Sequence, residues 1–564
     1  MRQTVVAILA FATLVGCDST DDVVSGNPVA AQPVVDTSPV FNIQRSDDRA
    51  PDTATDLTAY RSLDGSQNNL LLPDMNKSHS QLGRMMAPNY ADLMHTPAGA
   101  GLPMAREISN AVAAQPGPLT NAKGGSDFVW QWGQFLDHDL DLTEGVVPVE
   151  SFEIPIPVGD PWFDPRHTGT VALAFNRSIY DPETGDATVN PRQQINEITG
   201  WIDASNVYGS DLTRARALRT LDGSGQLKTS AGNFLPYNVD GLANAGGSGA
   251  ELFLAGDPRA NEQLGLTAMH TLFVREHNRL AGEIATANPN LDGEEIYQRA
   301  RRIVGAQMQQ ITYYEFLPVL LGADALAPYR GYDAYVDASI ANEFSTAAYR
   351  LGHSMLSDTI LRLDADFNPI ESGHLTLKEA FFQPHRLLSE GDIDPIMRGL
   401  AAQVCESVDS FVIDDVRNTL FGPPGSGGFD LVALNIQRGR DHGLPGYNRA
   451  RVAMGLAPRA SFAEVTSDAT LATKLASVYG SVDDIELWVG GLAEDTYGDS
   501  ALGELFHHIV VRQFEALRDG DRFWYEIALP PSELAAVRNT RLADIIRRNT
   551  GIGDELSDNV FVVR

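Results

Sequence analysis

Residues 134–141 read QFLDHDLD and place a histidine, an amide and three carboxylates within about two turns of one predicted helix. The preceding run, 127–133 (DFVWQWG), is apolar and aromatic, so most of this helix should be buried. Buried charges are retained only where they have partners. Gln134 and His138 share one face of such a helix, whereas Asp137 and Asp139 point to either side of His138. The helix can therefore line a cavity with His138 and bind a second group behind it.

Taken alone, Asp137-His138-Asp139 allows three interpretations. His138 could work in a cavity, the adjacent histidine and aspartates could be ligands of a metal-dependent phosphohydrolase, or His138 could be a structural histidine with satisfied hydrogen bonds. The helix itself does not decide between them, so the other motifs of the chain must.

Three further motifs follow in order along the chain. His353 lies in an otherwise apolar helical segment, 344–355 (FSTAAYRLGHSM), where Gly352 leaves room for something flat, and the other two motifs are 253–263 (FLAGDPRANEQ) and 433–448 (ALNIQRGRDHGLPGYN). With these motifs, the chain resembles the animal-type haem peroxidases, the peroxidase-cyclooxygenase superfamily that includes myeloperoxidase- and lactoperoxidase-like enzymes. The resemblance extends from about residue 60 to about residue 550.

The resemblance assigns one side of a haem site to two of these motifs. A haem peroxidase needs one axial protein ligand and one open position for peroxide, and neutral imidazole is the usual ligand. His353 matches the ligand, and Asn435 matches the acceptor that fixes the tautomer of that histidine. Arg350 and Arg438 match positions near the haem propionates, where guanidinium groups pair well with carboxylates.

The resemblance assigns the chemistry of peroxide cleavage to the opposite side. His138 would take a proton from hydrogen peroxide and return it to the leaving oxygen, which suits a side chain that titrates near neutrality. Arg259 would stabilise the charge that develops as the O–O bond breaks. Gln134, one turn before His138, would order a water molecule or a halide.

Two carboxylates match positions that become covalently attached to the cofactor in this family. By resemblance, Asp137 and Glu262 form esters with methyl groups of haem b through peroxide-driven self-processing. Gln263 stands where myeloperoxidase has a methionine that forms a third bond, which places the chain with the lactoperoxidase-like members and predicts little chloride oxidation. The alternative for Asp137 and Glu262 is simple pairing with a nearby arginine.

Asp139 is expected to face away from the haem, toward residues 199–210 (TGWIDASNVYGS). Thr199, Asp203 and Ser205 carry oxygen side chains on one side of an extended loop, and Trp201 can add its backbone carbonyl. An all-oxygen set of this kind suits calcium, and it matches the family's calcium site. The alternative is an ordinary Ser/Thr/Asp turn.

The N-terminus predicts export. A positive start is followed by an apolar run, 4–15, that is too short to span a bilayer, and residues 14–17 (LVGC) resemble a bacterial lipobox. We therefore expect a signal peptide at 1–16, a lipid anchor on Cys17, a flexible acidic tether at 17–55, and a location in the bacterial cell envelope. An ordinary secretory signal is the alternative, and it would release the protein to the outside.

Cysteine content and charge limit the remaining possibilities. The chain has two cysteines, so lipidation of Cys17 would leave Cys405 without an intrachain disulfide partner. The formal net charge of −32 opposes nucleic-acid binding and direct attraction to anionic membranes, so the lipid anchor is the expected membrane contact.

The motifs predict one large domain, 56–564, with a mainly α, myeloperoxidase-like fold and very little β structure. Positions 138, 259, 353 and 435 must converge in one body if they share a haem. Long amphipathic stretches at 295–321 and 502–517 support helices, with two short strand-like segments at most. The block 364–424 carries no recognisable motif and is expected to form walls of a substrate channel.

Three classes of function can be compared. The first is a peroxidase that uses hydrogen peroxide, through compound I, to oxidise bromide, iodide, thiocyanate or small phenols. The second is a fatty-acid dioxygenase of the cyclooxygenase-like branch, which is disfavoured because Arg350 stands where that branch has its radical tyrosine, and Tyr349 is expected to point elsewhere. The third, a haem-binding lipoprotein without turnover, has no use for both His138 and Arg259.

Overall fold

The computed structural model describes residues 60–425 and 427–563. The predicted signal peptide, the lipidated Cys17 and the acidic tether lie outside these residues. The described chain is mainly helical with very little β structure, so the predicted fold class is confirmed. None of its helices combines the length and apolar composition needed to cross a bilayer.

Helices connect most of the fold, and many of them are short. The first half of the chain contains α1 (Ala105–Val112), α2 (Phe128–Leu140), α3 (Ser205–Tyr208), α4 (Leu212–Leu218), α5 (Leu264–Ala287), α6 (Gly293–Ile311), the π-helical turn η2 (Thr312–Phe316) and α7 (Leu317–Leu321). The second half contains α8 (Asn342–Thr346), the 3₁₀ helix η3 (Ala348–His353), α9 (Leu377–Ala380), α10 (His385–Ser389), α11 (Asp394–Ala402), α12 (Asp414–Arg417), α13 (Leu431–Asp441), α14 (Tyr447–Ala453), α15 (Phe462–Val465), α16 (Ala469–Val478), η4 (Val482–Asp484), α17 (Leu487–Ala493), α18 (Glu504–Asp519), α19 (Tyr525–Ala528), α20 (Pro531–Arg538) and α21 (Leu542–Asn549).

The described chain contains six strands of two residues each, more than the two strand-like segments that the sequence predicts. They form three antiparallel pairs: β1 (Ser80–Gln81) with β4 (Ile195–Asn196), β2 (Ile154–Pro155) with β3 (Ala172–Leu173), and β5 (Thr359–Ile360) with β6 (Leu375–Thr376). Strands this short have no alternation of apolar and polar residues to detect, and β1 pairs with a segment more than a hundred residues away. Long-range pairing, and not local preference, creates them.

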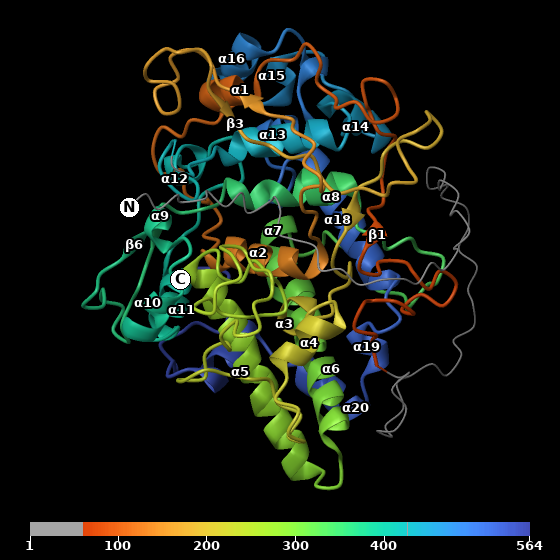
Figure 1. The fold of residues 1–564 in the computed structure, drawn as a ribbon, viewed down its shortest axis with the longest axis vertical. Helices are drawn as coiled ribbons and strands as arrows, with labels where there is room; N and C mark the ends of the chain where they lie inside the picture. The colour runs from red at the N-terminus through yellow and green to blue at the C-terminus, as the bar shows by residue number, and fades with distance from the viewer. Residues whose placement is uncertain (1–59, 426, 564) are drawn as a thin grey trace.

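The two long helices α5 and α6 run side by side and project beyond the rest of the molecule at the bottom of Figure 1. The first eleven residues of α5 are buried all round, so this end of the helix belongs to the core, whereas its second half has an exposed face. At the start of α6, Asp292 and Glu295 form a reciprocal capping box that satisfies free backbone N–H groups.

The predicted helical stretch 295–321 is continuous, but its middle is a π-helical turn, η2. Pro318 follows at the second position of α7 and has no N–H to give to the carbonyl four residues earlier, so a regular α-helical ladder cannot pass through this point. The wider turn places Phe316 and Tyr314 on different sides of the chain. Phe316 lines a cavity beside α2, whereas Tyr314 is 53% exposed.

Helix α2 lies at the centre of the molecule, between the α5/α6 pair and the upper group of helices that includes α13 and α14 (Figure 1). Its aromatic first half is packed on all sides: Trp132 contacts Phe135, Phe273 of α5 and Phe561 near the C-terminus, with ring centroids 5.8 to 6.2 Å apart. This packing fixes the helix along its length, and so it fixes the polar residues 134–141 at its end.

Candidate active site

A cavity beside α2 brings together most of the residues that the sequence singles out. It contains about 1320 Å³ of empty space, counting its opening to solvent. The predicted site residues on its walls are Gln134, Asp137, His138, Arg259, Glu262, Gln263, Arg350 and His353. The block 364–424 adds apolar wall residues, as expected for it: Leu377, Phe381, Val416, Leu420 and Phe421.

His138 and Arg259 both lie against a third residue, Asp257, that the sequence analysis does not identify. Asp257 is 1% exposed, and its carboxylate accepts hydrogen bonds from Nε and Nη2 of Arg259 at 2.9 and 2.8 Å. Its Oδ1 lies 3.6 Å from Nδ1 of His138. The only sequence signal is its place two residues before Arg259, where its Oδ1 also accepts from the backbone N–H of Arg259.

The charges around this group favour a neutral imidazole. Burial lowers the pKa of His138, and the positive charge of Arg259 lowers it further. Although burial of Asp257 acts in the opposite direction, the charge and the hydrogen bonds of Arg259 hold the pKa of that carboxyl at about 2. An ionised carboxylate therefore orients Arg259, while His138 remains free to accept a proton.

The amide side chain of Gln263 fixes the orientation of Gln134. Nε2 of Gln263 donates to Oε1 of Gln131 at 2.7 Å and to Oε1 of Gln134 at 3.0 Å, and its own Oε1 caps the first turn of α5 by accepting from the N–H of Gly265 at 2.6 Å. Gln263 is therefore fully used by hydrogen bonds of the fold.

Two partly buried carboxyl groups face the cavity from different segments. Asp137 exposes 28% of its side chain to this space, and its Oδ2 lies 3.5 Å from Nη1 of Arg259. Burial and the nearby Asp141 raise the pKa of Asp137, and burial raises the pKa of Glu262 to about 7. The simple pairing with arginine that the sequence leaves open is thus present for Asp137, whereas Glu262 accepts from Nε2 of Gln134 at 3.3 Å.

His353 lies at the end of η3 and lines the same cavity, and its partner is Asn435 of α13. Nδ1 of His353 is 2.8 Å from Nδ2 of Asn435, while Oδ1 of Asn435 accepts from Nη1 of Arg350 at 3.3 Å. In this orientation the amide nitrogen faces the ring, which is the reverse of the expected acceptor role. Because Arg350 can only donate, it holds the amide oxygen on its own side. A half-turn of the amide would present the oxygen to the histidine.

Arg438 does not reach the cavity. It lies on α13 beyond Asn435, and its Nη1 donates to the carbonyl oxygen of Asn176, to Oγ of Ser178 and to Oδ2 of Asp441, at 3.0, 2.7 and 3.0 Å. The predicted contact of Arg438 with a haem propionate stays a prediction, and it would have to use a guanidinium nitrogen other than Nη1.

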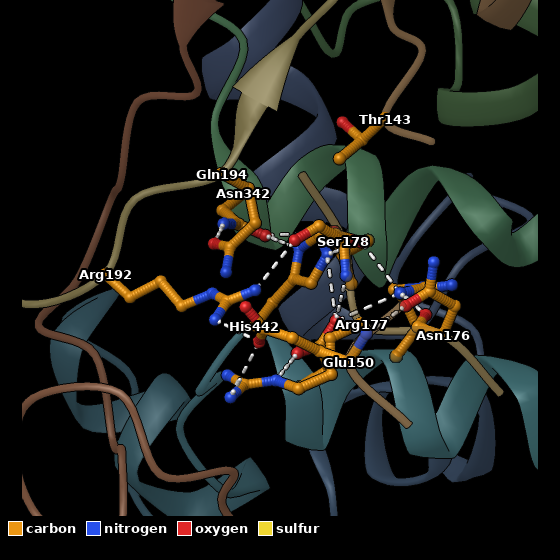
Figure 2. Close-up of polar contacts among 12 residues, drawn as sticks. Thr143, Glu150, Asn176, Arg177, Ser178, Arg192, Gln194, Asn342 and His442 are labelled. Atoms are coloured by element: carbon orange, nitrogen blue, oxygen red, sulfur yellow. Dashed lines mark hydrogen bonds and ion pairs between the residues drawn. The ribbon is translucent and has the colours of Figure 1, made fainter. Parts of the chain in front are cut away.

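The network around Ser178 also contains His442 (Figure 2). Nε2 of His442 is 2.7 Å from Oγ of Ser178, and Nδ1 is 2.7 Å from Oδ1 of Asn342. Beside it, Glu150 pairs with Arg192 at 2.6 Å. Both nitrogens of His442 are satisfied within the network, so it ties the end of α13 to the segment around residue 178 and to α8.

Tyr349 lines the same cavity, so the expectation that it points elsewhere is wrong. Its ring stacks on Phe344, with centroids 4.7 Å apart, and its buried hydroxyl has no hydrogen-bond partner in the described part of the chain. Burial raises the pKa of Tyr349, and the negative charges of Asp137 and Asp141 raise it further, so the phenol lies near the carboxylates of α2. The 3₁₀ geometry of η3 replaces the α-helical turn on which the expectation depends.

The predicted calcium residues meet behind α2, away from the cavity. Oδ1 of Asp139 accepts from Oγ of Ser205 at 2.8 Å, and Oδ2 accepts from the N–H groups of Asp203 and Ala204 at 3.1 and 3.0 Å. Oγ1 of Thr199 donates to Oδ1 of Asp203 at 3.0 Å, whereas Oδ2 of Asp203 is buried without a partner. Burial and the carboxylate of Asp203 raise the pKa of Asp139 to about 7.

This group has fewer charged side chains than many metal sites. No cluster of three or more His, Cys, Asp or Glu side chains suited to a metal occurs at 60–425 or 427–563. A cation here would therefore depend on hydroxyl and carbonyl oxygens in addition to the two carboxylates. The indole of Trp201 donates to the carbonyl oxygen of Gly65 at 3.1 Å and holds the loop in place.

Comparison with known proteins identifies the family of this chain. A sequence model of the family described as animal haem peroxidase matches residues 60–561. A mouse peroxidasin homologue is 37% identical over 89% of this chain and 37% of its own length, and pig thyroid peroxidase is 37% identical over 83% of this chain and 56% of its own length. The chain therefore spans only about two fifths to a little over half of such relatives.

Solved structures give the same architecture. Peroxidase A of Dictyostelium discoideum superposes with a TM-score of 0.83 at 33% identity and covers 89% of this chain and 99% of its own. Fatty acid alpha-dioxygenase of Oryza sativa superposes with a TM-score of 0.75, but at 22% identity it shows a shared fold alone.

Proposed function

Because this chain belongs to the animal haem peroxidase family, we propose that it is a haem-dependent peroxidase that uses hydrogen peroxide to oxidise small donors. The observation that carries the proposal is the cavity itself. His138, Arg259 and His353 all line it, although more than two hundred residues separate His138 from His353. A site that only stored a haem would need a ligand, but it would not need a buried acid–base group and a fixed cation as well.

The residues present fit a haem b. The cavity is large and mostly apolar on the His353 side. With the Asn435 amide turned so that its oxygen faces the ring, Nδ1 of His353 would donate to it and Nε2 would be left for a metal. Burial and the charge of Arg350 lower the pKa of His353 to about 3, so the ring is neutral, the form that can bind iron. A bound haem would supply the redox chemistry of peroxide reduction, and Arg350 on the cavity wall would pair with a propionate.

His138 would accept a proton from one peroxide oxygen and donate it to the other. Its neutral, buried imidazole can do both, and Arg259, fixed by Asp257, places positive charge beside the oxygen that leaves. Gln134, held by Gln263, would order the water or anion that shares this space.

Asp137 and Glu262 would each form an ester with a haem methyl group, with peroxide taking the two electrons released per bond. Both carboxyl groups line the cavity and neither is tied into a short ion pair. Gln263 is engaged in amide hydrogen bonds, so it supplies no third link, which favours bromide, iodide, thiocyanate and phenols as donors over chloride.

Behind α2, Asp139, Asp203, Thr199, Ser205 and the carbonyl of Trp201 would hold a calcium ion. Three observations support this site. Two carboxyl groups are buried next to each other, and Oδ2 of Asp203 has no partner among the described residues. The loop is also strained at Ala204, whose φ of +64° is unfavourable for a non-glycine residue, so something must stabilise it. The ion would lock the helix that carries His138.

Export is proposed from the sequence alone. The apolar run at 4–15 and the LVGC sequence at 14–17 support a lipid anchor on Cys17 and a place in the cell envelope. Cys405 is buried and free, so the described domain is held together without a disulfide of its own.

The alternative function, a fatty-acid dioxygenase, can be tested in the same experiment. The haem-loaded protein is mixed with hydrogen peroxide and, separately, bromide, iodide, thiocyanate, guaiacol or arachidonate, and both donor oxidation and oxygen uptake are followed. We expect oxidation of the anions and of guaiacol without oxygen uptake. Regiospecific oxygenation of arachidonate would replace the proposal by the alternative, and no turnover with any donor would remove both.

A further inference from the structure

A line of aromatic side chains leaves the cavity next to Tyr349. The ring of Tyr349 lies 5.8 Å, centroid to centroid, from Phe514 of α18, and Phe514 lies 5.9 Å from Tyr313 of η2. All three side chains are buried, and the hydroxyl of Tyr313 donates to the carbonyl oxygen of Phe514 at 2.6 Å. Phe514 therefore bridges two phenols, one at the cavity and one deeper in the protein.

The line continues to the surface through Trp524. Tyr313 and Trp524 are 4.8 Å apart, and Trp524 and Tyr525 are 4.9 Å apart. Tyr525 donates its hydroxyl to Oε1 of Gln310 at 2.6 Å, one turn before Tyr314 on the same helical segment. Burial raises the pKa of Tyr525, and a hydrogen bond with Tyr314 contributes, so the two phenols are neighbours. Tyr314 is 53% exposed and ends the line.

The phenols in this line differ in where a proton could go. Tyr313 donates to a backbone carbonyl and Tyr525 to an amide, and neither acceptor takes up a proton near neutral pH. Tyr349 lies near Asp137 and Asp141, but its hydroxyl makes no hydrogen bond to either of them or to any other described residue. Tyr314 donates to Oε1 of Glu526 at 2.9 Å. A phenol that loses an electron becomes a strong acid, so the oxidised state is stable only where a base accepts the proton. Along this line, that place is Tyr314.

We propose that the line Tyr349, Tyr313, Trp524, Tyr525, Tyr314 carries oxidising equivalents from the haem cavity to the surface, where Tyr314 oxidises phenolic donors too large to enter the cavity. The proposal rests on the peroxidase function proposed above, and it adds a second place of donor oxidation to it. Tyrosine and tryptophan are the side chains that lose an electron most readily, and electron transfer over a long distance is fast when it is divided into short steps between such groups.

The reaction balances without a further reagent. Reduction of one hydrogen peroxide to two waters withdraws two electrons from the protein in two steps. In each step Tyr314 loses one electron along the line and its proton to Glu526, and becomes a neutral tyrosyl radical. A surface phenol then returns an electron to Tyr314, and Glu526 returns the proton. The proton of the donor passes to solvent and replaces the one that solvent supplies for water formation in the cavity. Two donor phenols become two phenoxyl radicals for each peroxide consumed.

Spin trapping tests the first half of the proposal by a readout other than turnover. The haem-loaded protein is treated with hydrogen peroxide and 2-methyl-2-nitrosopropane, and mass spectrometry locates the adducts on tryptic peptides. We expect an adduct on Tyr314 in the parent, its loss in Tyr314→Phe, and a strong decrease in Tyr313→Phe. The latter keeps the ring that packs against Phe514 and removes the oxidisable phenol.

Tyr335→Phe is the matched control. Tyr335 is 63% exposed, more than Tyr314, but has no aromatic neighbour among the described residues, so its replacement should leave the Tyr314 adduct unchanged. Tyr314 is a surface residue and loses only a hydroxyl in the variant, so folding is not at risk. An adduct pattern that follows exposure, with Tyr335 labelled as strongly as Tyr314, would overturn the proposal.

A pair of donors with the same phenol tests the second half. Free tyramine is small, whereas tyramine coupled to a large dextran cannot enter the cavity. For Tyr314→Phe we expect kcat/KM with tyramine–dextran to fall by about tenfold or more, and kcat/KM with free tyramine to stay within about twofold. Equal rates of parent and variant with tyramine–dextran would overturn the surface site.

The outcomes separate this proposal from the peroxidase function. Normal oxidation of free tyramine without a Tyr314 adduct overturns the electron-transfer line and leaves the peroxidase function in place. Failure to oxidise either form of tyramine in the presence of peroxide overturns both.

Discussion

The two walls of the cavity differ in how they are built. The wall that carries His138 is dense in charge. Asp257 lies 3.6 Å from the imidazole, Asp137, Arg259 and Glu262 line the cavity, and each of the four has a partner from another segment. The wall that carries His353 has Asn435 and Arg350 as its polar groups, and the rest of it is apolar: Leu351, Met355, Leu356 and Leu431.

The difference corresponds to two kinds of work. Moving a proton and stabilising a developing charge require several groups whose pKa values are pushed apart, and these must be held rigidly. Binding a metal through one imidazole requires a neutral ring, one hydrogen bond to orient it and a dry environment. We therefore expect substitutions on the His353 wall to affect haem binding, and substitutions on the His138 wall to affect peroxide cleavage with the haem retained.

The largest effect is expected from His353→Ala. Removal of the single imidazole on this wall should abolish stable haem binding or leave a haem with an altered Soret band, because the axial bond is the main contact between protein and iron. Absorbance per protein after gel filtration measures it, with His95→Ala, an exposed histidine, as the control. A normal Soret band with full activity would show that His353 does not bind the haem iron.

His138→Ala should retain haem but slow the reaction with peroxide by about 10² to 10⁴, the usual contribution of one positioned acid–base group. Arg259→Ala should behave alike, since the charge it provides acts on the same bond. Stopped-flow spectroscopy of the peroxide step checks both variants. Loss of haem in either would mean that the two walls do not divide their tasks.

Asp257→Asn tests whether the carboxylate of Asp257 positions Arg259 on the His138 wall. Asparagine keeps the shape but removes the charge that holds Arg259, so we expect kcat/KM for peroxide to fall by about tenfold while KM for the donor stays constant. The Soret band should not change. An equal loss in both half-reactions would indicate a general disturbance of the fold instead of misplacement of Arg259.

Asp139→Asn and Asp203→Asn test whether the His138 wall is supported from behind by calcium. The parent should contain the ion by elemental analysis, and at a calcium concentration a hundredfold above Kd it should gain about 2.7 kcal/mol of unfolding free energy. Both variants should lose the ion and this gain. An active parent free of calcium would refute the site, and thermal unfolding in calcium or EDTA provides the measurement.

The smallest effect on turnover is expected from Asp127→Asn, at the contact between the walls. Oδ1 of Asp127 at the start of α2 accepts from Oγ of Ser357, which follows η3, at 2.8 Å, and burial raises the pKa of Asp127 to about 8. The folded protein therefore holds a proton that the unfolded chain releases near pH 4, and the free energy of unfolding falls as the pH rises from about 4 to about 8.

The variant should lose that part of the pH dependence, at most about 1.4 kcal/mol per pH unit, and be more stable than the parent at pH 8. Urea titrations at pH 5, 6.5 and 8 give the slope for each protein. Parallel slopes for parent and variant would show that Asp127 is ionised in the folded state.

Local patterns predicted the long elements well. The aromatic run and the polar residues after it correctly indicate α2, and the amphipathic stretches 295–321 and 502–517 correspond to α6 through α7 and to α18. In each case the information lies within a few turns of one segment. The π-helical turn escaped prediction because Pro318 can be met by a kink, a break or a wider turn, and the surrounding packing selects among them.

Contacts between distant segments were harder to predict. Asp257 looks like an ordinary loop aspartate until the fold places it against His138, and Tyr349 was assigned a direction from α-helical geometry that η3 does not have. Arg438 shows the same limit, because its partner Ser178 lies about 260 residues earlier in the chain.

The amino-acid sequence shows which chemical groups the protein has. Its four motifs, in their order along the chain, were enough to predict the family and the fold. It also determined that Gln134 and His138 share a face and that Asp139 does not, because helical geometry is local. The tertiary structure was needed to see that Asp257 holds Arg259 and that Arg438 is engaged away from the cavity. It was also needed to see that Tyr349 begins a line of aromatic rings that ends at Tyr314. The physical reason is that such contacts depend on how helices pack, and packing is set by the shapes of many side chains at once and not by the spacing of residues along one segment.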